Sequence, residues 1–243
     1  MHFKSSLFKT ALLACFIPFT ATNAEIIIHG TRAIYPSDAR EITLQVSNNG
    51  NKPALVQAWI DEGDAKSTPD QSQAPFMITP PISRVDSQKG QTLRISALPK
   101  TANLSQTQET LYWLNILDIP PKPSAKTTND VPDNFLQLAI RSRIKFFYRP
   151  SEIKGDSGAA PSKLQWTVLG DQLKVKNPTP FHITLTSINQ NNAGQRTDLI
   201  KEGLMLKPFS EDSVKLKGGN TSKMVFTSIN DYGGRVELPI RVQ

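Results

Sequence analysis

Few side chains in this sequence have the type and spacing that catalysis or metal binding requires. The three histidines are His2, His29 and His182, and the last two lie in strand-like runs, where a packed or surface histidine is much commoner than a catalytic one. The glycine pairs in "GGN" (218–220) and "DYGGR" (231–235) do not open a helix, so neither resembles a phosphate-binding loop. A Walker phosphate loop, a zinc-ligand spacing and a G-x-S-x-G elbow are all missing. The sequence therefore predicts a protein that is not an enzyme and uses no metal or cofactor.

The stretch "NFLQLAIRSRIKFFYRP" (134–150) suits a different chemistry, the pairing of one strand with another. Apolar residues recur at every second position, which is the period of a strand and not of a helix. They are Leu136, Leu138, Ile140, Ile144, Phe146 and Tyr148, with Ser142 at the remaining position. Alternation over 136–148 would extend about 43 Å at about 3.3 Å per residue, against about 17–20 Å for a usual strand. One small sandwich cannot easily cover so long an apolar edge.

Short apolar runs separated by turn residues recur along the chain and predict the elements that position this strand. Runs such as "GQTLRISAL", "KLQWTVL" and "FHITLTSI" have the length of strands, and no amphipathic helical window of ten or more residues occurs. "NNGN" (48–51), between "ITLQVS" and "ALVQAWI", predicts a hairpin because Asn and Gly adopt positive φ in tight turns. The sequence thus predicts an all-β fold, and its many short strands favour sandwiches over barrels.

The first residues have the features of a secretory signal. Lys4 and Lys9 form a positive region, and the apolar run at 11–19 that follows is too short to span a membrane. Small residues then predict cleavage after position 24. Cys15, the only cysteine, lies inside this segment, so the mature chain would contain no disulfide. We therefore expect a signal peptide at 1–24 and no membrane span in the rest of the chain.

The charge of the mature chain is moderately positive. Without Lys4 and Lys9 the formal net charge falls from +7 to +5. Such an excess, scattered along the chain, suits binding of an acidic group or of a negatively charged surface. An exported protein meets no nucleic acid in its compartment, so we expect no nucleic-acid partner.

A change of composition predicts two domains. "RPSEIKGDSGAAPSK" (149–163) is rich in Pro, Gly, Ser and Ala, and it divides residues 25–150 from residues 151–243. Both blocks have the size of an immunoglobulin-like sandwich. A second polar and proline-rich segment, "PPKPSAKTTNDVPDN" (120–134), predicts a mobile loop just before the long strand.

Six segments form a recognisable set when they are taken in order. They are "TRAIY" (31–35), "TPPISRVDSQKGQTLRI" (79–95), "LSQTQETLYWLNILDIPP" (104–121), "IRSRIKFFYRP" (140–150), "NPTPFHITL" (177–185) and "INDYGGR" (229–235). Together they resemble the PapD-like periplasmic chaperones of the chaperone–usher pathway in Gram-negative bacteria. The resemblance covers nearly all of residues 25–243, with two departures. Thr107 stands where the family usually has an acidic residue, and the loop at 120–134 is longer than in the family members with the shortest loops.

The resemblance implies that Leu136, Leu138 and Ile140 are not covered by their own domain. They would be lent to a pilin subunit, an incomplete sandwich that lacks its last strand. The edge of the strand would supply backbone hydrogen bonds, and its apolar side chains would fill the open core of the pilin. The alternative is that these residues face their own core, as those of most alternating strands do.

The resemblance also implies roles for five charged residues. Arg32 and Lys145 would grip the terminal carboxylate of the pilin in a cleft between the domains, and so fix the register of the two strands. Glu109, Arg149 and Asp231 would form an ion network that holds the two sandwiches at a fixed angle. The residue types alone leave open that all five are solvated surface charges.

The fold and function implied are those of a two-domain chaperone. We expect two immunoglobulin-like sandwiches set at an angle, like a boomerang, with a pilin-binding cleft between them. The protein would bind pilin subunits in the periplasm by donor-strand complementation, prevent their aggregation and deliver them to an outer-membrane usher. The alternative is an exported structural pilus component or a two-domain adhesin. The exposed strand edge also leaves self-association of the free chaperone open.

Overall fold

The computed structural model describes residues 26–121, 137–192, 195–218 and 224–243. The predicted signal peptide, Leu136 and most of the segment 120–134 lie outside these residues. Within the described residues the chain forms strands joined by turns, with two short 3-10 helices, η1 (Pro99–Asn103) and η2 (Ala160–Lys163). The prediction of an all-β fold is confirmed. No helix in this part of the chain is both long enough and apolar enough to cross a membrane.

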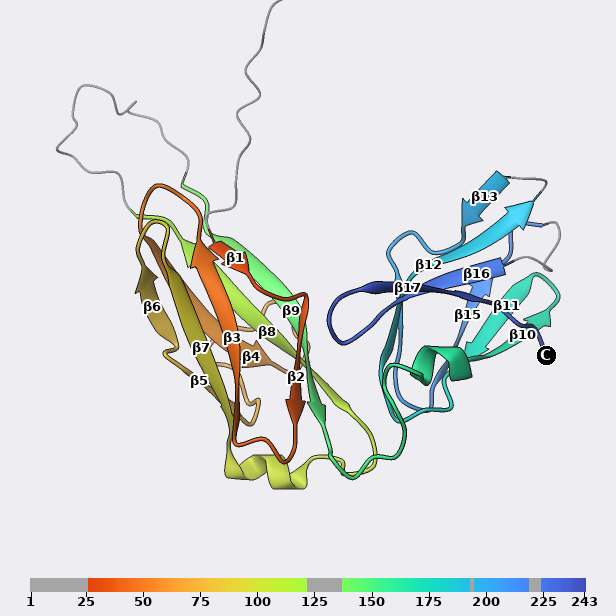
Figure 1. Ribbon diagram of the computed structural model, residues 1–243, viewed down its shortest axis with the longest axis horizontal. Coiled ribbons are helices and arrows are strands. Elements are labelled where there is room, and N and C mark those ends of the chain that lie inside the picture. The colour runs from red at the N-terminus through yellow and green to blue at the C-terminus, as the bar shows by residue number, and fades with distance from the viewer. Residues whose placement is uncertain (1–25, 122–136, 193–194, 219–223) are drawn as a thin grey trace, which may run out of the picture.

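The first domain is a sandwich of two sheets (Figure 1). One sheet has the order β1-β3-β7-β5, formed by β1 (Ile26–Ile28), β3 (Glu41–Asn48), β7 (Gly90–Ala97) and β5 (Phe76–Thr79). The other has the order β2-β9-β8-β4-β6, formed by β2 (Arg32–Pro36), β9 (Ile140–Arg149), β8 (Thr110–Ile119), β4 (Ala54–Asp61) and β6 (Ile82–Val85). The chain changes sheets between β1 and β2 at Gly30, whose φ of 142° favours glycine. The strands β2 and β9 are parallel to each other.

Alternate apolar residues fill the space between these two sheets. Leu44 and Val46 of β3 point inward and are buried. From the opposite sheet, Tyr35 and Phe146 meet Phe76, with ring centroids 5.4 and 4.7 Å apart. Burial of one such side chain contributes about 1.5–3 kcal/mol. Because Phe146 belongs to β9, the core fixes the C-terminal half of that strand.

The second domain is a smaller sandwich with its own core. Its three-stranded sheet has the order β10-β11-β15, formed by β10 (Gln165–Leu169), β11 (Gln172–Lys176) and β15 (Glu211–Lys215). The facing sheet has the order β13-β12-β16-β17, with β14 also paired to β12, and it consists of β12 (Ile183–Asn192), β13 (Gln195–Asp198), β14 (Leu204–Leu206), β16 (Met224–Ile229) and β17 (Arg235–Pro239). Between the sheets, the rings of Trp166 and Phe226 lie 5.2 Å apart.

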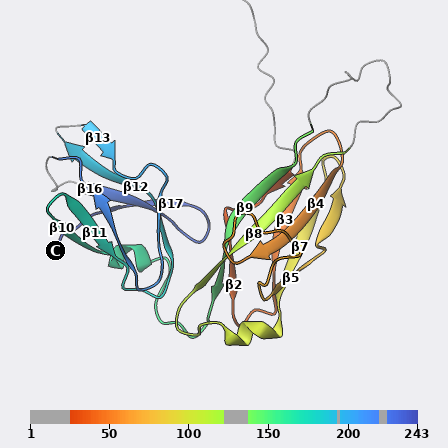
Figure 2. The same ribbon diagram turned by 180° about the vertical axis from the view of Figure 1, so that it is seen from behind.

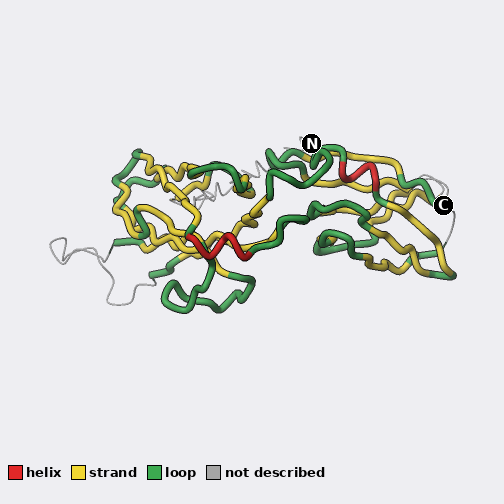
Figure 3. Tube along the Cα trace, turned by 90° about the horizontal axis from the view of Figure 1, so that it is seen from below, coloured by secondary structure: helices red, strands yellow, loops and turns green. Residues whose placement is uncertain are grey.

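The two sandwiches stand at an angle to each other. Figures 1 and 2 show them joined by the segment that follows β9, with the turn between β16 and β17 reaching toward the first domain. Seen from below in Figure 3, the two sandwiches follow one another along the length of the molecule. Their buried apolar residues form two separate clusters. The predicted architecture of two angled sandwiches is confirmed.

The predicted hairpin at "NNGN" is wrong. The strands β3 and β4 on either side of it belong to opposite sheets. Asn48 is fully buried there; its side-chain amide donates to the carbonyls of Lys52 and Val85, and its oxygen accepts from the Gly50 amide. These bonds hold a turn that passes from one sheet to the other. Alternation reveals which face of a strand is buried, but both strands face the same core, so the pattern did not reveal that they lie in different sheets.

The long strand is shorter than its alternating pattern. β9 begins at Ile140, and residues 137–139 lie outside any strand. The neighbouring strand β8 ends at Ile119, and the last pair between the two strands joins Asp118 to Ile140. A strand needs a neighbour to complete its backbone hydrogen bonds. Regular pairing of β9 therefore stops where β8 stops.

Candidate functional site

Arg149, the last residue of β9, lies between carboxylates from both domains. Its Nε lies 2.6 Å from Oε1 of Glu109, the residue that directly precedes β8. Its Nη1 lies 2.6 Å from Asp231 Oδ2, in the turn after β16, and its Nη2 lies 2.9 Å from Asp231 Oδ1. A bidentate pair of this kind fixes orientation as well as distance. The structure thus brings together the three residues of the predicted ion network, across the boundary between the domains.

Two residues that the sequence analysis missed, Ser157 and His182, contact this network, and Phe147 packs against the second of them. Ser157, in the connection between the domains, accepts a hydrogen bond from Arg149 at 3.2 Å and donates one to Asp231 at 2.8 Å. The backbone amide of His182 donates to the second carboxylate oxygen of Glu109 at 2.7 Å, and its ring lies 5.3 Å from that of Phe147. The composition of 149–163 indicated a linker and gave no signal for Ser157. Phe147 falls on the charged side of the alternation, so its burial by the second domain was not predictable.

The charges in the network stabilise one another. Burial alone lowers the pKa of Arg149, but the hydrogen bonds and charges of Asp231 and Glu109 outweigh it and raise the pKa above its ordinary value. Burial likewise raises the pKa of Asp231, yet the hydrogen bonds and charge of Arg149 hold it below its ordinary value. Because the folded pKa of Asp231 is lowered, its stabilising contribution is present at neutral pH and is lost as the pH falls below about 4.

We expect Arg149→Ala to destabilise the protein and to loosen the angle between its domains. The change leaves Glu109, which is 3% exposed, without its guanidinium partner and facing the second carboxylate, Asp231. Breaking one side of such a pair costs about 2–4 kcal/mol, less than for a fully buried pair because Asp231 is partly exposed. Chemical denaturation measures the free energy of unfolding, and small-angle scattering measures the change in shape.

Arg196→Ala serves as the matched control for this change. Arg196 pairs with Glu237 on the surface, where both side chains are about half exposed. Loss of an exposed pair costs about 0–1 kcal/mol. If Arg149→Ala had the same free energy of unfolding and the same small-angle scattering as the Arg196 variant, the ion network would have no part in joining the domains.

Arg32 and Lys145 lie side by side on the two parallel strands. They are register partners, Arg32 at the start of β2 and Lys145 in the middle of β9. Both reach the second domain: Lys145 Nζ donates to Thr184 Oγ1 at 2.9 Å, and Arg32 Nη1 donates to the carbonyl of Ile229 at 3.3 Å. The structure therefore brings the two predicted anchor residues together, at a surface that both domains form.

The electrostatics of this pair favour an added anion. Burial, and then the charge of Arg32, lower the pKa of Lys145 to about 8. Burial also lowers the pKa of Arg32, although Asp231 and Glu109 partly oppose this. Within the described residues neither cation has a carboxylate within salt-bridge distance, and the buried Nε of Arg32 has no hydrogen-bond partner. A carboxylate placed between the two groups would relieve their repulsion and accept their hydrogen bonds.

The core of the first domain covers only the C-terminal part of the apolar face that β9 and the residues just before it present. Phe146 and Tyr148 are buried, Ile144 packs at the rim of the core, and Ile140 and Leu138 are 49% and 62% exposed. The alternative that Leu138 and Ile140 face their own core does not agree with these exposures. Leu136, the third predicted residue, lies outside the described residues.

One edge of the same part of β9 is open. The strand β8 pairs with β9 from Ile140 to Tyr148, whereas β2 pairs with its other edge only from Lys145 onward. Among the described residues, no strand pairs with that edge between Ile140 and Ile144. An open edge beside exposed apolar side chains is a template for a further strand. This open edge ends at the Arg32–Lys145 pair.

Both domains match models of known families. Residues 25–154 match the family described as pili and flagellar-assembly chaperone, PapD N-terminal domain. Residues 159–240 match the family described as pili assembly chaperone PapD, C-terminal domain.

Whole-chain relatives are similar over nearly their full length. The chaperone protein MrkB of Klebsiella pneumoniae is 44% identical over 238 residues, which cover 97% of this chain and 99% of that protein. The crystal structure of the YadV chaperone is 37% identical, with a TM-score of 0.74 over 90% of this chain and 100% of that one. The SafB chaperone of Salmonella enterica, solved in complex with the SafA pilin, gives a structure match at 29% identity with a TM-score of 0.72, covering 88% of this chain and 96% of the matched chain.

Proposed function

The chain belongs to the family of PapD-like pilus-assembly chaperones, and we propose that it captures pilin subunits in the periplasm by lending them the open part of β9. Its relatives named above are chaperones and not pilus subunits, which favours this function over that of a structural pilus component or an adhesin. The observation that carries the proposal is the open edge and exposed apolar face of β9, which end at two adjacent cations.

The cation pair is suited to the α-carboxylate at the end of a pilin. Arg32 and Lys145 each offer charge-assisted hydrogen bonds, which contribute about 1.5–3 kcal/mol apiece. The α-carboxylate occurs once in a chain and at a fixed place, so holding it sets the register of everything before it. Register matters here because a slip of one residue would turn every apolar side chain of the pilin strand to the wrong face.

The position of the anchor also sets the direction of the captured strand. A chain that ends at Lys145 and lies along the open edge has its earlier residues beside Ile144, then beside Ile140. It therefore runs in the same direction as β9, parallel to it. The strand β2 is parallel to β9 as well and begins at Arg32, so the pilin strand would lie on the same edge, just ahead of β2.

The exposed apolar residues at the start of β9 and in the segment just before it supply the rest of the affinity. Leu138 and Ile140, with Leu136 expected beside them, would enter the open core of the pilin, and each would contribute about 1.5–3 kcal/mol before the costs of association. The Glu109–Arg149–Asp231 network would keep the second domain in place, and with it Thr184 and the carbonyl of Ile229 beside the anchor. The capped subunit would then pass to an outer-membrane usher, and no nucleotide or cofactor enters this scheme.

Recovery of the protein from periplasm tests this function. We expect the mature chain to elute with a pilin subunit in a 1:1 complex, identified by native mass spectrometry and peptide sequencing. Denaturation of the complex should release a subunit that aggregates on its own, because its core is missing a strand. A chain recovered from an actively piliated culture without any pilin, or built stably into the fibre, would contradict the proposal.

A further inference from the structure

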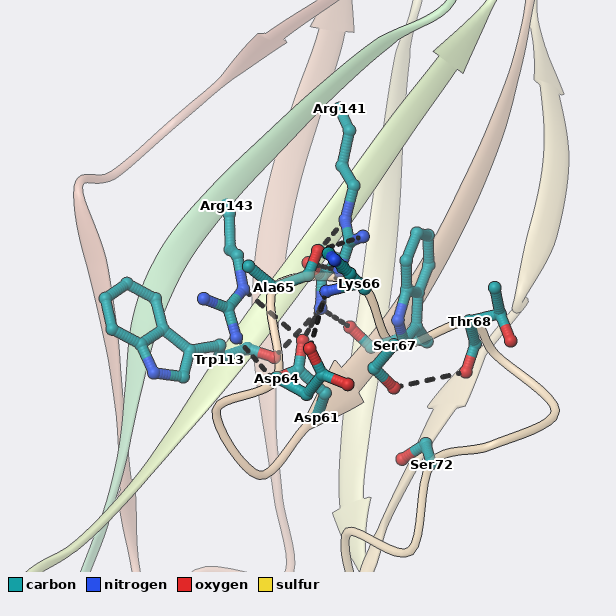
Figure 4. A network of polar contacts seen from close by, with 12 residues as sticks. Asp61, Asp64, Ala65, Lys66, Ser67, Thr68, Ser72, Trp113, Arg141 and Arg143 are labelled. Carbon is teal, nitrogen blue, oxygen red and sulfur yellow. Dashed lines mark hydrogen bonds and ion pairs between the residues drawn. The ribbon is translucent and has the colours of Figure 1, made fainter.

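The open part of β9 carries two arginines on the face opposite to the one it would offer to a pilin. Arg141 and Arg143 alternate with Ile140 and Ile144, so they point to the other side of the sheet. Figure 4 shows both guanidinium groups extending from β9 toward Asp61, the last residue of β4. The proposed capture of pilin does not use either arginine.

Both arginines bond to buried polar groups on the neighbouring strands. Arg143 Nη2 lies 2.5 Å from Asp61 Oδ1, and Arg141 Nη2 lies 3.5 Å from Asp61 Oδ2. Arg141 also donates to Asn115 Oδ1 of β8 at 2.7 Å from Nη2 and 2.9 Å from Nε, and to the carbonyl of Ala65 at 2.9 Å. Asn115 in turn donates to Asp61 at 2.7 Å. Asp61 and Asn115 are both fully buried, so the bonds to these two side chains are largely shielded from water, whereas the bond to the carbonyl of Ala65 is exposed.

Each guanidinium group also lies over the ring of a tryptophan. The Arg141 guanidinium lies 4.6 Å from the ring centre of Trp59, and that of Arg143 lies 4.4 Å from the ring centre of Trp113. Such cation–π contacts fix the planar groups as well as attract them. We call the set of Asp61, Asn115, Trp59, Trp113 and the two arginines the arginine ladder. It connects β9 with β8, with β4 and with the loop that follows β4.

The arginine ladder contacts the part of β9 that has the fewest other stabilising contacts. Between Ile140 and Ile144, β9 has a partner strand on one edge only, and Ile140 is half exposed on the other face. A segment with one paired edge and little apolar burial opens locally at low free energy. The ladder supplies attachments on the one face that pilin capture leaves free.

We propose that Arg141 and Arg143 are positioning residues for pilin capture, because they hold the open part of β9 extended against β8 before a subunit arrives. This inference rests on the proposed function. A frayed segment cannot accept a strand. The apparent affinity is therefore the affinity of the ordered form multiplied by the fraction of molecules in which the segment is ordered. The ladder thus raises affinity for a pilin strand without contacting it.

Two variants test the ladder in the free, full-length mature protein. Arg141→Gln removes one arginine and leaves Asp61 paired with Arg143. The triple variant Asp61→Asn, Arg141→Gln, Arg143→Gln removes both arginines and the buried carboxylate together, so that no unpaired charge stays buried. Arg84→Gln is the control, because Arg84 lies on β6 of the same sheet and pairs with Asp86 at the surface.

Hydrogen exchange followed by mass spectrometry is the first readout. We expect exchange of those β9 amides between Ile140 and Ile144 that donate to β8 to become about tenfold faster or more in the triple variant, and to rise less in Arg141→Gln. The amides of Leu93 and Ile95 on β7, in the other sheet, should exchange as in wild type. A uniform loss of protection would indicate a general stabilising role, and unchanged exchange at Ile140–Ile144 would show no ordering role. Either result overturns the inference.

Binding of a synthetic peptide is the second readout. The probe alternates valine and threonine and ends in a free carboxylate; the same peptide with an amidated end is its control. We expect the triple variant to bind the carboxylate peptide about tenfold more weakly, mainly through slower association. Equal binding despite faster exchange would overturn the inference. Wild type that binds neither peptide would contradict the proposed function instead, and the exchange data would still decide whether the ladder orders β9.

Discussion

Leu138→Asp should leave the chaperone folded and abolish its capture of pilin. Leu138 is 62% exposed in the free protein and makes no contribution to either core, so the change should alter the free energy of unfolding by less than about 0.5 kcal/mol. In the complex the same position would face the open apolar core of the pilin. A carboxylate there loses its hydration without gaining a partner, which costs several kcal/mol, and the burial of leucine is lost as well. We expect the affinity for pilin to fall about 100-fold or more.

A thermal melt and a pilin pull-down, made on the same preparation, separate the two possible roles of this residue. If Leu138 belonged to its own core, Leu138→Asp would lower the melting temperature sharply. Leu169→Asp is the matched control, because Leu169 is 53% exposed on β10 of the second domain, away from the open edge of β9. The control should melt and capture pilin like wild type. A Leu138 variant that still captured pilin would exclude the segment just before β9 from the interface.

The alternating pattern predicted the fold class well because burial of one face leaves a direct trace in the sequence. The period of two between residues 136 and 148 predicted a strand with one apolar face. The composition of "RPSEIKGDSGAAPSK" gave the proposed division into residues 25–150 and 151–243. Pairing leaves no such trace. The sheet change between β3 and β4 depends on the buried bonds of Asn48, and the start of β9 at Ile140 depends on where β8 ends.

The candidate site was predictable only where a motif had a family resemblance. Arg32, Lys145, Glu109, Arg149 and Asp231 were named in this way, and the structure places them in two groups at the domain boundary. Ser157 and His182 contact the network through a linker serine and a backbone amide, and neither contact has a sequence signature. Arg141 and Arg143 resembled ordinary exposed charges of an alternating strand. Their buried partner, Asp61, lies about eighty residues earlier, which no local pattern connects.

Lys145→Met should also weaken pilin capture strongly, while the free protein stays at least as stable as wild type. Methionine keeps a stem of similar length and removes the charge. In the free protein that charge is partly buried and lies beside Arg32, so its removal relieves desolvation and repulsion. The captured carboxylate loses a charge-assisted partner and its fixed place in the register, which we expect to weaken binding about 10- to 100-fold. Arg32→Ala should act similarly on capture.

The two anchor changes together should cost less than the sum of the single changes. Arg32 and Lys145 are register partners and would hold the same carboxylate, so once one is lost the other binds a group that is no longer fixed. A double-mutant cycle, with pilin affinity measured by calorimetry, gives this coupling directly. Full additivity would mean that the two cations bind different groups.

The lowered pKa of Lys145 makes the anchor sensitive to pH in a specific direction. Lys145 loses its proton as the pH rises through about 8 in the free protein, against an ordinary value of 10.5. Affinity for pilin should therefore fall between about pH 7 and pH 9, and Lys145→Arg should remove this fall because arginine stays charged.

The stability of the free protein should change with pH in the opposite direction. Between pH 8 and 10.5 the unfolded chain binds more protons at this position, so this residue's contribution makes the free energy of unfolding rise with pH in wild type relative to Lys145→Met.

These opposite slopes distinguish an anchor from a structural lysine. A lysine that supported the fold would lose both stability and capture when it is neutralised, whether by pH or by substitution. When a lysine whose role is to bind the carboxylate of a partner is neutralised, the free protein becomes more stable and captures less pilin. A double variant, Arg32→Ala with Lys145→Met, that still protected pilin from proteolysis would show that the register is set elsewhere along β9.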